Sequence, residues 1–130
     1  MLLSQKESLT ILIIDDEHLI LDIVSEMLNF LNHRAIVTSS AHDGIELFKQ
    51  KRNEIDAIIV DLIMPDMNGK ECYEELRKID PHIPIVLSTG ISDAGSKEGL
   101  KNLDVLGFLE KPYTLPQLES ILNKIKTADS

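Results

Sequence analysis

Short apolar runs alternate with stretches of helical periodicity along most of this chain. Runs of four to six residues that are rich in β-branched side chains are typical of strands. Three of these runs have no polar alternation, as expected of strands that helices cover on both faces. The pattern predicts strands over residues 10–14, 35–38, 57–60, 83–88 and 105–109.

Apolar residues at three- and four-residue spacing predict helices between these strands. The clearest runs predict a helix over 17–32 and a C-terminal helix from Leu115 to Ile125, with Thr114 as its N-cap. Shorter helices are predicted around 43–50 and 70–79. The segment 91–103 is the least stable predicted element, because each of its two glycines costs a helix about 1 kcal/mol.

This order of elements predicts an α/β fold. Short connections and right-handed crossovers favour a flavodoxin-like, doubly wound, five-stranded parallel sheet with strand order 2-1-3-4-5 and helices on both faces. A chain of 130 residues with 43% hydrophobic content is sufficient for one domain. We predict that this domain covers residues 9–126, between an N-terminal tail (1–8) and a C-terminal tail (127–130).

The net charge and the cysteine content indicate which partners are disfavoured and which compartment is favoured. The net charge of −9 opposes nonspecific attraction to nucleic acid and to anionic membranes, so neither is an expected direct partner. A single cysteine, Cys72, cannot form an internal disulfide and is expected to be a packed thiol. The N-terminus has no signal-peptide pattern and no apolar run is long enough to span a membrane, which predicts a cytoplasmic protein.

Acidic residues follow two of the predicted strands. The first strand runs into Asp15, Asp16 and Glu17, and the third runs into Asp61. With strand order 2-1-3-4-5 these two strand ends meet where the winding direction reverses, which is where such sheets bind ligands. Clustered carboxylates repel one another and need a positive partner, and a set of oxygen ligands suits Mg²⁺.

The fourth and fifth strands bring complementary groups to the same edge. The fourth ends with the hydroxyls of Ser88 and Thr89, and the fifth is followed by Lys111, a compact charge suited to phosphate. Carboxylates, hydroxyl, lysine and metal together predict a phosphoryl site. Asp61 is the candidate acceptor, because an ionised carboxylate can attack phosphorus and form an aspartyl phosphate without a base.

Four motifs in this order resemble the response regulator receiver domain of two-component signalling. They are "IIDDE", "IIVDLIMPDMNG", "LSTG" and "GFLEKPY", and the resemblance covers about residues 9–126. Each motif alone has a simpler structural explanation, such as a helix cap or a turn, so their joint occurrence carries the resemblance.

The resemblance implies a role for each matching position. A sensor histidine kinase or a histidine phosphotransfer protein would donate the phosphoryl group, and the chain would be a signalling module rather than an enzyme. Its downstream protein target would read a surface formed by segment 91–103, the fifth strand and the last helix. The implied residues are Asp61 as acceptor; Asp15, Asp16, Asp61 and the Ile63 carbonyl as Mg²⁺ ligands; Thr89 and Lys111 on the phosphoryl oxygens; Phe108 with Thr89 as the switch; and a cis Lys111–Pro112 bond.

Two further positions bear on the lifetime of the phosphorylated state. In this family the residues two beyond the acceptor and two beyond the switch hydroxyl influence how water reaches the phosphoaspartate. These positions are Ile63 and Ile91, both bulky and apolar, so we expect slow self-dephosphorylation.

Other functions of the same fold fit these residues less well. A pseudo-receiver that only binds partners is the main alternative, and an aspartyl-phosphate hydrolase is disfavoured because Ile63 stands where that class needs a second acid. A flavin-binding module is disfavoured because the acidic stretch after the first strand would repel phosphate. The receiver could stand alone or belong to a hybrid sensor kinase.

Overall fold

The computed structural model describes residues 7–90 and 102–128. Predicted segment 91–103 therefore lies almost wholly outside the described residues, as does Ile91. The elements follow one another as β1 (Thr10–Ile14), α1 (His18–Phe30), β2 (Arg34–Thr38), α2 (Ala41–Lys51), a 3-10 turn (Arg52–Glu54), β3 (Ala57–Asp61), α3 (Gly69–Ile79), β4 (Ile85–Thr89), β5 (Gly107–Glu110) and α4 (Leu115–Ala128).

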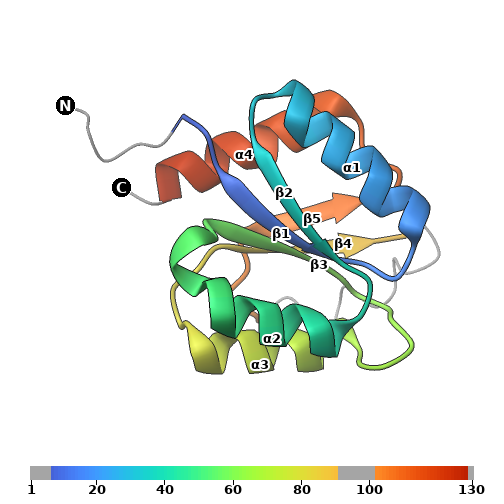
Figure 1. Ribbon diagram of the computed structural model, residues 1–130, viewed down its shortest axis with the longest axis vertical. Coiled ribbons are helices and arrows are strands. Elements are labelled where there is room, and N and C mark those ends of the chain that lie inside the picture. Colours follow the sequence, from blue (N-terminus) through green and yellow to red (C-terminus); the bar gives the residue numbers. More distant parts are fainter. Residues whose placement is uncertain (1–6, 91–101, 129–130) are drawn as a thin grey trace.

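The five strands form one parallel sheet in the order β2-β1-β3-β4-β5, which confirms the predicted topology. The chain first winds outward from β1 to β2 and then returns past β1 to β3, so the winding direction reverses between β1 and β3. Figure 1 shows the sheet running through the middle of the molecule.

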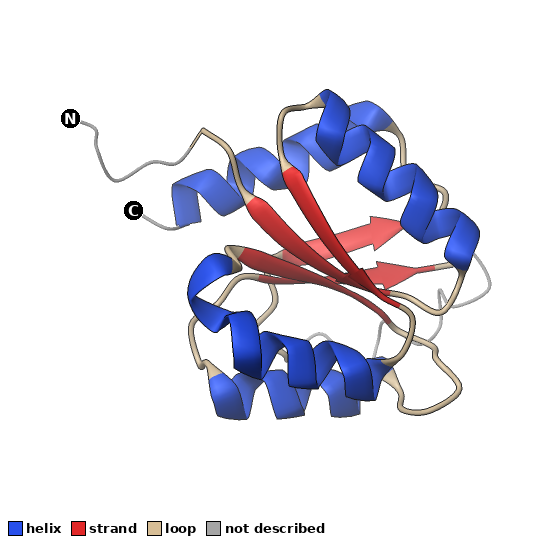
Figure 2. Cartoon of the chain, in the orientation of Figure 1, coloured by secondary structure: helices blue, strands red, loops and turns tan. Residues whose placement is uncertain are grey.

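Helices cover the sheet on both faces. In Figures 1 and 2, α1 and α4 lie on one face and α2 and α3 on the other. Strand residues alternate between the two resulting cores: Ile13 and Ile59 pack with α1 and α4, whereas Ile14 and Val60 pack with α2 and α3. Every residue of β3 and β4 is buried, which explains their uninterrupted apolar sequences.

The helix starts are set by polar caps. The Ser40 side chain accepts the Asp43 N–H at the start of α2, two residues earlier than predicted. Asn68 and Glu71 form a reciprocal capping box at the start of α3. Thr114 Oγ1 accepts the Gln117 N–H while the Gln117 side chain accepts the Thr114 N–H, which confirms Thr114 as the cap of the last helix.

The predicted element ends differ from the structure by a few residues. Helix α1 occupies 18–30 rather than 17–32, and α4 continues to Ala128, two residues into the predicted C-terminal tail. Strand β4 occupies 85–89 rather than 83–88. The fifth strand begins at Gly107 instead of residue 105, because the Val105 N–H turns back to the Leu103 carbonyl.

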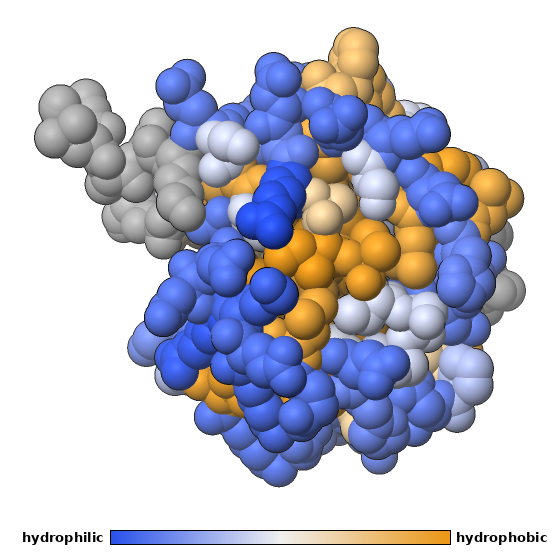
Figure 3. Space-filling model, viewed as in Figure 1, coloured by the Kyte–Doolittle hydropathy of each residue, from blue (hydrophilic) through white to orange (hydrophobic). Residues whose placement is uncertain are grey.

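Some apolar side chains remain exposed on the surface. Leu19, Ile23 and Phe30 lie on one side of α1, and Val37 is exposed on the edge strand β2. Figure 3 shows hydrophobic surface over β2, framed by hydrophilic side chains. Within residues 7–90 and 102–128, no helix combines the length and the apolar character needed to cross a bilayer.

Candidate functional site

Three carboxylates meet at the C-terminal edge of the sheet, where the winding direction reverses. Ile14 of β1 pairs with Val60 of β3, so the next step of the register brings Asp15 beside Asp61. Both are buried, with 1% and 4% of their surface exposed. Asp15, Asp16 and Asp61 can each offer an oxygen within 4.8 Å of the others. The structure therefore brings together the acids that the sequence predicted to meet.

Lys111 supplies the positive charge for this cluster. Its Nζ lies 2.9 Å from Asp15 Oδ2, 3.2 Å from Asp61 Oδ2 and 2.8 Å from Glu17 Oε1. Although burial disfavours the charged form, hydrogen bonds to Glu17 and Asp15 raise the pKa of Lys111 well above its ordinary value. The ammonium group thus stays charged and bridges acids that would otherwise repel one another.

The pKa of Asp61 reflects its burial first and the neighbouring negative charge second. Burial, and then the neighbouring Asp15 carboxylate, raise the pKa of Asp61 to about 7, even though Lys111 and a hydrogen bond from the Ile63 backbone act in the opposite direction. One lysine does not fully compensate the carboxylates around it. A divalent cation that prefers oxygen ligands fits this donor set, because it would add the missing positive charge.

The end of β4 contributes two hydroxyls in different environments. Thr89 has no exposed surface, and its Oγ1 has no hydrogen-bond partner among the described residues. A buried hydroxyl without a partner is costly and can donate to an incoming oxygen. Ser88 is also buried, but its Oγ donates to the Tyr113 hydroxyl at 3.2 Å.

The segment after β5 is attached to β4 through Lys111 and Tyr113. The Lys111 N–H donates to the Thr89 carbonyl at 2.6 Å, and the Lys111–Pro112 bond is cis, as the sequence resemblance implied. Neither the role of Tyr113 nor the contact of Glu17 with Lys111 was predicted from the sequence. The available signals were an aromatic residue two positions after the lysine and a third acid after Asp15 and Asp16.

The loop between β3 and α3 is fixed at several points. The Gly69 N–H donates to the Leu62 carbonyl at 2.7 Å, and a Cβ at Gly69 would lie 2.7 Å from Leu62 Cα, so only glycine fits this approach. Asp66 accepts the backbone N–H groups of Ala41 and His42 at the start of α2. The loop that follows Asp61 is therefore tied to both α3 and α2.

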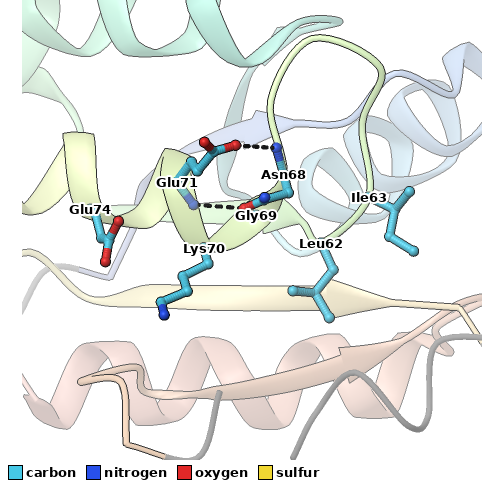
Figure 4. A pocket seen from close by; sticks show the side chains of 7 residues that line it. All are labelled: Leu62, Ile63, Asn68, Gly69, Lys70, Glu71 and Glu74. Carbon is cyan, nitrogen blue, oxygen red and sulfur yellow. Dashed lines mark hydrogen bonds between the residues drawn. The ribbon is translucent and has the colours of Figure 1, made fainter. Parts of the chain in front are cut away.

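Two predicted residues flank the site without belonging to its charged centre. Ile63 is 56% exposed and lines a pocket with Leu62 and Lys70, where Figure 4 also shows the capping box of α3. Phe108 is half-buried and packs against the core on the α2 and α3 face. Ile91 lies outside the described residues.

Sequence comparisons relate this chain to known signalling proteins. The family model "Response regulator receiver domain" matches residues 11–123. The autoinducer 1 sensor kinase/phosphatase LuxN of Vibrio campbellii is 33% identical over 89% of this chain, and the sensor kinase CckA of Brucella abortus is 26% identical over 91%. The chain spans only 13% of LuxN and 12% of CckA.

A solved structure also has the same fold. The response regulator receiver domain protein from Clostridium thermocellum superposes with a TM-score of 0.85 at 29% identity. The alignment covers 92% of this chain and 94% of that one.

We expect Asp61→Asn to stabilise the metal-free protein, and the gain to grow with pH. A carboxyl whose folded-state pKa is raised from 3.8 to about 7 costs stability as pH rises through that window, and the amide does not titrate. With solvent screening, the gain relative to wild type should increase by about 1–2 kcal/mol between about pH 5 and about pH 8. Urea unfolding with EDTA measures it.

The exposed Asp22 of α1 provides a matched control, because Asp22→Asn removes the same charge away from the cluster. A gain for Asp61→Asn that stays constant with pH, or that Asp22→Asn reproduces, would contradict this account of the site.

Proposed function

Because the chain belongs to the response regulator receiver family of two-component signalling, we propose that Asp61 accepts a phosphoryl group from a phosphohistidine. The donor would be a sensor histidine kinase or a histidine phosphotransfer protein. The observation that carries this proposal is the buried Asp61 carboxylate, held 3.2 Å from the Lys111 ammonium and beside Asp15 and Asp16.

Asp61 acts as the nucleophile. One of its carboxylate oxygens forms a bond to phosphorus while the bond between phosphorus and the histidine nitrogen breaks. The electron pair of that bond returns to the imidazole of the donor, and the product is a mixed anhydride on Asp61. The raised pKa implies that the carboxylate must be deprotonated before it can attack, which the charges of Lys111 and a bound cation favour.

Lys111 and Thr89 stabilise the transferred group. The Lys111 ammonium already contacts Asp61, and another of its N–H groups can donate a hydrogen bond to a phosphoryl oxygen. The Thr89 hydroxyl, which has no hydrogen-bond partner among the described residues, can donate a hydrogen bond to another phosphoryl oxygen. Asp15, Asp16, Asp61 and the Ile63 carbonyl would hold Mg²⁺, which supplies charge neutralisation for the phosphoryl oxygens when bound.

A change at Thr89 would be transmitted to the surface through Phe108. If Thr89 moves toward the phosphoryl group, it vacates space near the end of β4 into which the half-buried Phe108 can turn. The surface that includes β5, α4 and the segment before β5 would then change for a downstream protein target. Phe108 lacks a phenol hydroxyl, so this readout works through packing rather than a hydrogen bond.

The protein would act as a signalling module, either alone or as part of a hybrid sensor kinase, and would have no further substrate to turn over. We place it in the cytoplasm, where the buried free thiol of Cys72 is compatible with a reducing environment.

A pseudo-receiver that only binds partners is the remaining alternative. An aspartyl-phosphate hydrolase is disfavoured, because Ile63 offers no acid two residues after Asp61.

Incubation with acetyl phosphate and Mg²⁺ should add about 80 Da to the intact mass, the value for one phosphoryl group on a carboxylate. Asp61→Asn should abolish the gain, because an amide is not a nucleophile toward phosphorus. Asp22→Asn should retain it. A wild-type protein without this gain would support the pseudo-receiver alternative.

Beryllofluoride with Mg²⁺, which mimics the phosphoryl group, should shift NMR signals of residues 102–113 as well as those around Asp61. The physical reason is the path from Thr89 to Phe108 across the paired strands β4 and β5. Asp61→Asn serves as the negative control. Changes confined to the acidic cluster would rule out the switch while leaving the acceptor role intact.

Ile63→Asn should shorten the lifetime of the phosphorylated protein by about three- to tenfold, because a polar side chain beside Asp61 admits and orients water. Decay of the mass gain after removal of the donor measures this. Phe30→Asn, which changes another exposed apolar residue at the opposite end of α1 from the site, is the control. An equal or longer lifetime for Ile63→Asn would contradict the shielding role. The same expectation applies to Ile91.

A further inference from the structure

Ser88 lies in the same row of the sheet as the acids of the site. It pairs with Asp61 of β3 on one side and with Leu109 of β5 on the other. Ile59 and Val86, two residues earlier in each strand, belong to the core that packs against α1 and α4. Because side chains alternate along a strand, Asp61 and Ser88 also face that side.

The Tyr113 hydroxyl forms a hydrogen bond with Ser88 on this side of the sheet. Tyr113 packs in the same core, with 6% of its surface exposed, and it accepts the Ser88 hydroxyl at 3.2 Å. Both partners are buried, so water cannot replace either of them without entering the core. The bond is therefore specific, and it joins β4 to a residue 25 positions later in the sequence.

Lys111 is connected to β4 at two points through this arrangement. Its own N–H donates to the Thr89 carbonyl, and Tyr113, two residues later, is bound to Ser88. The lysine side chain is long and flexible, whereas its ammonium must reach the Asp15 and Asp61 carboxylates at once. A second attachment reduces the freedom of the backbone from which that side chain extends.

We infer that Tyr113 is a positioning residue for Lys111, acting through its hydrogen bond with Ser88. This inference rests on the proposed function, because it concerns the lysine that stabilises the transferred phosphoryl group. Tyr113→Phe keeps the ring in the core and removes only the hydroxyl, so Lys111 loses one of its two attachments. The rate of phosphoryl transfer depends on how accurately the Lys111 ammonium is positioned beside the phosphoryl oxygens, so a small displacement of this group reduces the rate.

The two tyrosines of the chain provide a matched pair of variants. Tyr73 is also buried, with 7% of its surface exposed, and its hydroxyl accepts the Asp104 N–H at 2.9 Å, away from the acidic row. Tyr73→Phe therefore makes the same chemical change at a hydroxyl that contacts Asp104 and Arg77 instead of the segment that carries Lys111.

The experiment measures the initial rate of mass gain with acetyl phosphate at saturating MgCl₂, together with urea unfolding for each variant. We expect Tyr113→Phe and Ser88→Ala each to lower the rate by about fivefold, and the double variant to be no slower than either. Tyr73→Phe should leave the rate unchanged. In a Lys111→Met background, Tyr113→Phe should have no further effect on the rate, although its effect on stability should persist.

The outcomes separate this inference from the proposed function. If wild-type protein gains no mass, the proposed function fails and the role of Tyr113 fails with it. If wild type gains mass but Tyr113→Phe reacts at the wild-type rate, only the positioning role is overturned. It is also overturned if Tyr113→Phe slows the reaction equally with and without Lys111, because Tyr113 would then not act through the lysine.

Discussion

The buried pair of Asp15 and Asp61 depends on the ammonium group of Lys111. Two carboxylates removed from water and placed side by side would repel strongly, and the bridging lysine offsets part of that repulsion. The sheet topology requires this arrangement, because both acids follow strands that become neighbours where the winding direction reverses. The same lysine then determines what the site can bind, since the remaining excess of negative charge favours a divalent cation and its positive charge favours a phosphoryl group.

Adjacent residues of β4 connect this site to opposite sides of the molecule. Ser88 faces the α1 and α4 side, where it binds Tyr113, whereas strand alternation places Thr89 on the side of Leu87 and Phe108. The two hydroxyls therefore have separate surroundings although they follow one another in the sequence. In the proposed mechanism, Thr89 responds to the phosphoryl group, while Ser88 helps to keep Lys111 in place.

Much of the architecture could be predicted from local patterns, and the site followed from the topology. Uninterrupted apolar runs identified β3 and β4, and their polar ends placed Asp61 and Thr89 at one edge. The missed features depend on contacts between distant segments. The hydrogen bond of Tyr113 with Ser88 and the capping of α2 by Asp66 have no periodic signal in the sequence. The start of β5 was misplaced because Val105 and Leu106 are apolar like strand residues, whereas the Val105 N–H turns back to the Leu103 carbonyl and the strand begins only at Gly107.

The loop from Leu62 to Gly69 has a consequence for how this protein can vary. Its backbone closes between these two residues, while Asp66 in its middle reaches the first N–H groups of α2. An added or deleted residue would break one of these attachments, whereas a substitution at an exposed position such as Ile63 would leave both in place. The loop can therefore vary in side-chain chemistry at exposed positions other than Asp66, whereas a change in its length would cost it one of its two anchors.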